Sequence, residues 1–230
     1  MAGTGKLRAD GFNGPVKVLT SCPSCLQGLS RYNDDVGTEA DYIVVPVRAA
    51  DAPLAKGGLD LAIVIDTSAA TDAPSLAIAR AATAALLAHL GKDDRVAVWA
   101  GDTGLTPIVP GGDQLEAIDE AGRRDVLARL SRVERGGATD LGSVLSLAAA
   151  KLDPARRGAV VYIGDGTPTV GELGLQDLRD KLAKLPRPVR MFGIGVGDEA
   201  NVALLEGLAR GGFAERVSDA NAAGRTALRL

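Results

Sequence analysis

The sequence is poor in the residues that build disulfide scaffolds, metal–thiolate centres and aromatic-rich cores. Its 230 residues include two cysteines, one histidine and only 3% aromatic residues. Cys22 and Cys25 form a single C-x-x-C, which excludes a fold built on several disulfides and cannot complete a four-thiolate zinc or iron–sulfur site alone. The lone His89 lies near the end of a predicted helix, and no nucleophile–base pair stands out. The core is therefore expected to consist mainly of Ala, Val, Leu and Ile.

The sequence also lacks a dominant charge and a long hydrophobic run. Its 26 basic and 29 acidic residues give a net charge of −3, and no basic stripe points to nucleic acid. No apolar stretch approaches the length of a membrane span, and residues 1–10 lack the apolar middle of a secretion signal. We expect a soluble chain without membrane insertion. Its compartment stays open, because a fragment of an exported parent would carry no signal of its own.

The pattern of residues divides the chain into three parts. Residues 1–41 read as an N-terminal extension of loops and one weak strand that contains the C-x-x-C. Residues 42–58 read as a strand followed by a linker. From residue 59 to 230, apolar runs alternate with helical periodicity, which is typical of an open, mainly parallel α/β sheet with helices on both faces. We expect this doubly wound, Rossmann-like domain to stop inside its last helix.

The expected elements of this domain follow from the apolar runs and from boundary residues. Pro74 suits a first helical turn, and Gly91 and Pro186 each follow a predicted helix end. The predicted strands are Asp60–Ile65, Arg95–Trp99, a short one near Leu105–Val109, Ala159–Ile163, Val189–Ile194 and Glu215–Val217. The predicted helices are Pro74–Leu90, Gln114–Leu130, Leu141–Lys151, Leu173–Leu185 and Glu199–Arg210.

Oxygen-bearing side chains gather in three loops of this pattern. Asp66 and Ser68 follow the first strand, Thr139 lies in the long connection before the next core element, and Asp165 follows the strand Ala159–Ile163. Ligands of open α/β sheets bind beyond the carboxyl ends of the strands. Carboxylates and hydroxyls without thiolate or imidazole are typical ligands of a hard cation such as Mg²⁺. Each loop alone would favour a helix cap or turn, but their order along the strands favours a shared site.

This order of motifs resembles the von Willebrand factor type A family and its metal-ion-dependent adhesion site. Asp66 to Ala70 match the family's Asp-x-Ser-x-Ser except at Ala70, which brings no hydroxyl. The resemblance implies that Ser68 and Thr139 coordinate Mg²⁺ or Mn²⁺ directly, while Asp66 and Asp165 hold it largely through waters. It also implies a protein partner whose Asp or Glu completes the ion's coordination, with no enzymatic activity. A water replaces the hydroxyl missing at Ala70 in this interpretation.

Two alternatives remain beside this cation-dependent binding module. The domain could be a metal-free scaffold, in which Ala70 replaces a ligand because the site no longer binds an ion. The other alternative is a thiol or electron-transfer enzyme fragment that uses Cys22 and Cys25. Residues 16–45 resemble a short cysteine-containing segment of bacterial FAD and iron–sulfur D-lactate dehydrogenase-like oxidoreductases, although the other cluster ligands are missing.

The larger part of the chain resembles A-type domains that accompany an inter-α-trypsin-inhibitor-type (VIT) domain in bacterial proteins. Residues 42–48 would then be part of the connection to that companion domain, which this chain lacks. The resemblance implies a mode of action rather than a particular partner, because one fold supports many binding functions.

Overall fold

The computed structural model describes residues 16–20, 38–42, 57–109, 111–227 and 229. The chain divides into two compact units, residues 1–53 and residues 54–230. In the first unit, β1 (Val16–Thr20) and β2 (Thr38–Tyr42) pair in parallel. The predicted weak strand at residues 16–19 thus has a counterpart, whereas residues 43–47 of the other predicted strand lie outside the described residues. Cys22 and Cys25 also lie outside them.

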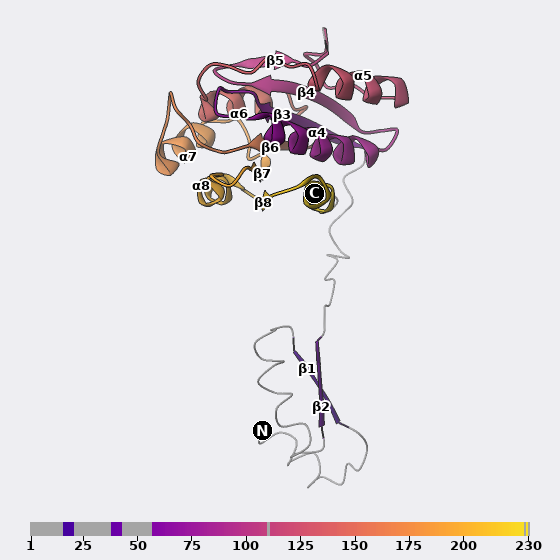
Figure 1. The fold of residues 1–230 in the computed structure, drawn as a ribbon. Coiled ribbons are helices and arrows are strands. Elements are labelled where there is room, and N and C mark those ends of the chain that lie inside the picture. Colours follow the sequence, from indigo (N-terminus) through magenta and orange to yellow (C-terminus); the bar gives the residue numbers. More distant parts are fainter. Residues whose placement is uncertain (1–15, 21–37, 43–56, 110, 228, 230) are drawn as a thin grey trace. The chain divides into compact units, whose positions relative to one another are not determined.

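The second unit is a six-stranded sheet covered by helices on both faces, as the alternating pattern predicts (Figure 1). The strand order is β5-β4-β3-β6-β7-β8, and only the short β5 runs antiparallel to its neighbour. Its strands are β3 (Leu59–Asp66), β4 (Arg95–Gly101), β5 (Leu105–Pro107), β6 (Arg157–Gly164), β7 (Arg190–Val196) and β8 (Ala214–Val217). Its helices are α4 (Ala73–Ala88), α5 (Glu120–Leu130), α6 (Leu141–Ala150), α7 (Leu175–Ala183), α8 (Val202–Leu208) and α9 (Ala220–Ala227).

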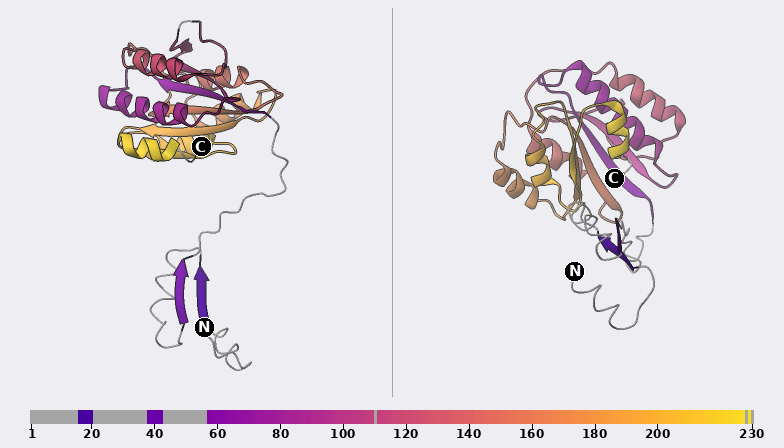
Figure 2. Two further views of the ribbon diagram at one scale, coloured as in Figure 1. Left: turned by 90° about the vertical axis from the view of Figure 1, so that its right-hand side faces the viewer. Right: turned by 60° about the horizontal axis from the view of Figure 1, so that its bottom comes forward.

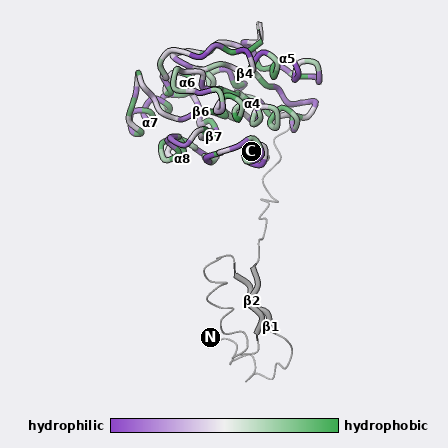
Figure 3. Tube along the Cα trace, viewed as in Figure 1, coloured by the Kyte–Doolittle hydropathy of each residue, from purple (hydrophilic) through white to green (hydrophobic). Residues whose placement is uncertain are grey.

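Each face of the sheet has its own hydrophobic core, because successive side chains of a strand point to opposite faces. Leu61, Ile63 and Ile65 of β3 pack in one core with buried residues of α4, α5 and α9. Ala62 and Val64 pack in the other with buried residues of α6, α7 and α8. Two further views show the strands between these layers of helices (Figure 2). Hydrophobic and hydrophilic positions alternate along the covering helix α5 (Figure 3).

The helix predicted from Gln114 begins later, at Glu120, where Asp119 accepts the amide of Gly122 at 2.8 Å as an N-terminal cap. Residues before it pair with the sheet instead. The amide of Val96 donates to the carbonyl of Glu116 at 2.8 Å, and the amide of Glu116 donates back at 3.2 Å. The apolar spacing of residues 114–118 imitates a helix, but the open edge of β4 offers these backbone groups better partners. The prediction of a helix start at Gln114 was therefore wrong.

The two ends of β3 carry aspartates that are both completely buried. Asp60 at the start accepts hydrogen bonds from Arg95 at 2.9 and 2.6 Å and from Arg156 at 2.7 Å. Burial alone would raise the pKa of Asp60, but the two guanidinium groups hold this pKa below its usual value. Asp60 is thus a paired structural anchor at the end of the sheet opposite the candidate site.

Candidate functional site

The candidate site lies where β3 and β6 end side by side. The parallel register pairs Ile65 with Ile163, so Asp66 comes level with Gly164, and Asp165 follows directly. Gly164 is required by this close approach, because a Cβ there would overlap the Cβ of Asp66 and lie 2.7 Å from the hydroxyl of Tyr162. The sheet register therefore brings two of the predicted ligands to one edge.

Backbone hydrogen bonds attach the loop before α6 to the loop after β3. The amide of Gly136 donates to the carbonyl of Thr67 at 2.9 Å, and the amide of Ala69 donates to the carbonyl of Gly137 at 3.2 Å. Gly137 has a φ of +81°, a conformation that favours glycine. These contacts hold the segment that carries Thr139 against the segment that carries Ser68.

A second set of hydrogen bonds joins Thr139 to the loop after β6. The amide of Thr139 donates to the hydroxyl of Thr169 at 2.8 Å, and the amide of Thr169 donates to the carbonyl of Thr139 at 2.9 Å. All three predicted loops are thus tied into one layer at the carboxyl ends of the strands. Asp66, Ser68 and Thr139 are almost fully buried there, and Asp165 is half-buried.

The carboxylate of Asp66 is held by neutral donors on both oxygens. The amide of Ser68 donates to Oδ1 at 2.8 Å, and the hydroxyl of Tyr162 donates to Oδ2 at 2.5 Å. Among the described residues, no Lys, Arg or His forms an ion pair with Asp66 or Asp165. Asp66 thus differs from Asp60 in the same strand, which is equally buried but paired with two arginines.

Burial, and after it the closeness of the acidic groups, determines the pKa shifts of the site. Burial raises the pKa of Asp165, the negative charge of Asp66 raises it further, and the amide of Thr167 at 2.9 Å opposes this shift. Burial likewise raises the pKa of the Tyr162 hydroxyl well above its usual value, and the neighbouring Asp66 adds to this. Two carboxylates without a cationic side chain favour any bound positive charge.

The hydroxyl of Ser68 is the feature that best tests whether a cation fits. It is buried, and it has no hydrogen-bond partner in the described part of the chain. Buried polar groups are nearly always satisfied, and a missing ion is a recognised reason for an exception. An orphaned hydroxyl in the turn of Asp66, at the sheet edge that also carries Asp165, is an oxygen ligand of the kind that Mg²⁺ and Mn²⁺ take. The residues present therefore fit the ion that the resemblance implies.

Ala70 is exposed and lines a cleft of about 530 Å³ together with Asp66 and Asp165. The next hydroxyl in sequence, that of Thr71, donates to the backbone carbonyl of Asp66 at 3.2 Å and is thereby used in the turn. A side chain at position 70 therefore faces the cleft.

No group of three His, Cys, Asp or Glu side chains arranged to hold a metal is found within the described ranges. A cation at this site would therefore depend on the hydroxyls of Ser68 and Thr139 as well as on the two carboxylates. Sequence reasoning missed Tyr162 and Thr169, whose hydrogen bonds position the predicted ligands Asp66 and Thr139. A hydroxyl-bearing tyrosine inside an otherwise apolar strand, three residues before Asp165, was the available signal.

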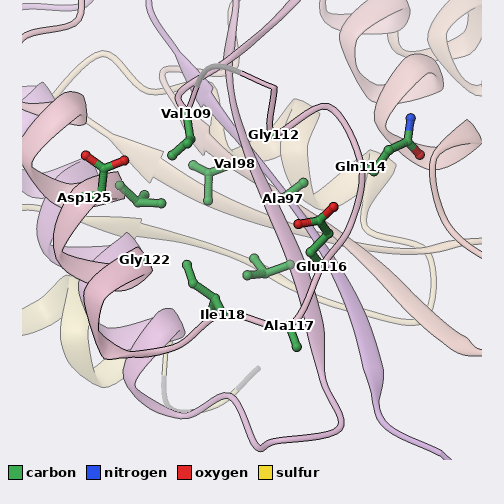
Figure 4. Close-up of a pocket in the computed structure, with 12 residues that line it drawn as sticks. Ala97, Val98, Val109, Gly112, Gln114, Glu116, Ala117, Ile118, Gly122 and Asp125 are labelled. Carbon is green, nitrogen blue, oxygen red and sulfur yellow. The ribbon is translucent and has the colours of Figure 1, made fainter.

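Another hollow, of about 140 Å³, lies between β4, Val109 with residues 112–118, and α5 (Figure 4). Its lining is mainly apolar and includes Val98, Val109 and Ile118, with Glu116 and Asp125 at its sides. None of the predicted ligands lines it. No helix in the described part of the chain is long and apolar enough to cross a membrane.

Comparisons with known proteins agree with this architecture. The model of the von Willebrand factor type A domain family matches residues 59–214. A search of curated proteins finds no match.

Several solved structures share the fold at low sequence identity. A von Willebrand factor type A protein from Catenulispora acidiphila has a TM-score of 0.66 and 20% identity over 75% of this chain, which spans 42% of that protein. An aerotolerance-related membrane protein from Bacteroides fragilis has a TM-score of 0.58 and 18% identity, covering 75% of this chain and 98% of its own. The PilB minor pilin from Streptococcus sanguinis has a TM-score of 0.58 and 11% identity, covering 84% and 66%.

Proposed function

The chain belongs to the von Willebrand factor type A domain family, and from this premise we propose that it is a non-enzymatic, divalent-cation-dependent module that binds a protein partner. The hydroxyls of Ser68 and Thr139 and the carboxylates of Asp66 and Asp165 hold Mg²⁺ or Mn²⁺. An Asp or Glu of the partner completes the coordination. When bound, the ion supplies the positive charge that joins the two acidic surfaces.

One observation carries this proposal: Asp66 is buried without a cationic partner beside the unpaired hydroxyl of Ser68. Burying a charge is costly unless it is paired, and β3 shows the paired solution at its other end in Asp60. The difference between the two ends supports a role for Asp66 beyond stability. Preorganised but uncompensated acidic groups are typical of functional sites.

The charge of the cleft supports the requirement for the ion. Asp72, Asp198 and Glu199 line the same cleft as Asp66 and Asp165. A partner carboxylate that approaches these residues meets like charge, which opposes binding. We therefore expect binding of an acidic partner to be lost when a chelator removes the ion.

Isothermal titration of the chelator-treated chain with Mg²⁺ and Mn²⁺ tests the proposal. We expect saturable binding at one site, abolished in Asp165→Ala and weakened at least tenfold in Thr139→Val, since each change removes a proposed ligand. Asp198→Ala is the matched control, because it removes an exposed carboxylate from the same cleft without touching the proposed ligands. Equal loss in Asp198→Ala would indicate diffuse binding to acidic surface instead.

The absence of a hydroxyl at Ala70 favours a second candidate, a metal-free scaffold domain. In that case the wild-type chain shows no heat of binding at millimolar Mg²⁺. Asp66→Ala and Asp165→Ala then leave partner binding unchanged. The thiol-enzyme alternative rests on Cys22 and Cys25, outside the described residues, and stays a sequence-based prediction.

A further inference from the structure

Two exposed hydrophobic side chains stand in the loop that begins with Asp165. Within the described residues, three large hydrophobic side chains are exposed: Leu147 at 46%, Val170 at 40% and Leu173 at 57%. Leu147 belongs to α6, whereas Val170 and Leu173 lie in the loop between β6 and α7 (Figure 1). Single exposed hydrophobics are ordinary on protein surfaces, but two within four residues beside a candidate site are a reason to ask what they contact.

The backbone of Val170 is attached to the candidate ligand Thr139. The amides of Thr169 and Val170 both donate to the carbonyl of Thr139, at 2.9 and 3.2 Å. The hydroxyl of Thr169 accepts the amide of Thr139 at 2.8 Å. A chain fixed at these points cannot turn Val170 inward without breaking contacts that position the site.

The backbone next to Leu173 is held at a second point. The carboxylate of Glu172 accepts a hydrogen bond from Lys181 at 2.7 Å, and Lys181 also donates to the hydroxyl of Ser143 at 3.0 Å. Gly171 has a φ of +71° and lies so close to Asp140 that a Cβ would come within 2.7 Å of its Oδ1. The backbone immediately before Leu173 is thus anchored, and the Leu173 side chain is 57% exposed.

Resting on the proposed function, we propose that Val170 and Leu173 form a second contact of the same binding site. The partner is a polypeptide that presents an Asp or Glu to the cation and a large apolar side chain a few residues away. The carboxylate supplies cation-dependent attachment, and the apolar residue covers Val170 and Leu173. Leu173 is surrounded by charged groups of both signs, among them Asp177 and Lys184, which suits a peptide rather than a continuous lipid phase.

The partner chemistry follows from what each part of the surface lacks. The buried acidic groups lack a positive charge, and the exposed apolar groups lack cover from water. A single peptide that supplies a carboxylate and an apolar side chain can satisfy both groups, because the loop between β6 and α7 carries Asp165 as well as Val170 and Leu173. Because apolar burial adds to attachment at the ion, the two contacts together also select among acidic partners.

The test is selection from a random linear peptide library displayed on phage, with the full chain as bait in millimolar Mg²⁺ and elution by chelator. We expect eluted peptides to combine an Asp or Glu with a large apolar residue within a few positions. A synthetic peptide of that sequence should bind the double variant Val170→Ser, Leu173→Ser about tenfold more weakly, as expected for losing partial burial of two side chains. Leu147→Ser is the matched control and should bind like the wild type.

Mg²⁺ titration of the same variants separates this inference from the proposed function. The double variant should keep the wild-type affinity for Mg²⁺, because neither side chain is a proposed ligand. Chelator-eluted peptides with a carboxylate but no apolar preference, or equal binding by the double variant, would overturn the inference and leave the cation-dependent function standing. Failure of the chelator to release any peptide would overturn both.

Discussion

At the scale of single residues, Ala70 is the point where this site departs from its family's motif. The side chain is exposed and faces the cleft, so a serine hydroxyl would have room there. We predict that Ala70→Ser tightens Mg²⁺ binding by up to about tenfold, because a fixed hydroxyl replaces a water that must be immobilised. Calorimetric titration of both proteins with Mg²⁺ measures the difference in affinity. Ala69→Ser, a change at the neighbouring exposed alanine, is the control. Equal affinity in all three proteins would contradict this role of position 70.

The carboxyl group of Asp165 makes the stability of the folded chain depend on pH. Because its pKa is raised in the folded chain, the stability associated with this group is fully present below the free value of 3.8 and is lost as pH rises through the raised value. Without metal, Asp165→Asn should therefore be more stable than wild type at neutral pH, with the difference vanishing below pH 3.8. Urea unfolding in chelator across this range checks the sign.

Added Mg²⁺ should reverse that order. The ion stabilises a folded chain that binds it, so the wild type gains stability that the Asn variant lacks. A variant that is less stable than wild type in chelator at neutral pH would contradict the electrostatic account of Asp165.

Tyr162 is the residue that holds the second oxygen of Asp66. Tyr162→Phe removes only this hydroxyl, which donates to Asp66 Oδ2 at 2.5 Å and accepts the amide of Gly166 at 3.3 Å. Since a buried carboxylate oxygen is left without its donor, the free energy of unfolding in chelator should fall by about 1–3 kcal/mol. Urea unfolding measures it, and an unchanged midpoint would show that water replaces the hydroxyl without cost.

At the scale of elements, β3 performs two tasks at its two ends. Its start is fixed through Asp60 by Arg95 and Arg156, while its end carries the candidate ligands. Asp60→Ala should cost roughly 3 kcal/mol of stability, because Arg156 loses its carboxylate partner and Arg95 keeps only that of Asp153. Asp125→Ala, which breaks an exposed pair with Arg129 in α5, should change stability by about 0.5 kcal/mol or less. Similar losses in both variants would argue against Asp60 as an anchor.

Strands and helices could be predicted from the sequence where the local apolar pattern suits the same element as the contacts made in the fold. The apolar runs of β3, β4, β6 and β7 are buried on both faces, so their composition alone marks them. Residues 114–118 show the opposite case. Their spacing suits a helix, but Glu116 pairs with the edge of β4, a partner distant in sequence.

The same distinction applies to the candidate site. The positions of Asp66, Ser68 and Asp165 after strands could be predicted, because strand ends of a parallel sheet share one edge. Thr139 lies between α5 and α6, and its place in the proposed set came from the order of motifs. The hydrogen bonds from Tyr162 to Asp66 and from Thr139 to Thr169 join residues 96 and 30 positions apart. Contacts of this range depend on the register between strands, which composition does not determine.

At the scale of the whole molecule, the groups that stabilise the domain and the residues of the proposed site lie at opposite ends of the sheet. Hydrophobic layers and the paired Asp60 stabilise the fold, whereas uncompensated acidic and exposed apolar groups collect at the opposite end of the strands. Proteins accept such locally unfavourable groups where a ligand later satisfies them. The central claim is therefore that a cation belongs among Asp66, Ser68, Thr139 and Asp165.

The most direct test is an anomalous difference map from crystals of the chain soaked in Mn²⁺, with Ser68→Ala crystals soaked in parallel. The account predicts a peak in the wild type roughly 2.1 Å from the hydroxyls of both Ser68 and Thr139, and a weakened or absent peak in the variant. An empty site in the wild type, or a peak held only by Asp198 and Glu199 elsewhere in the same cleft, would contradict it.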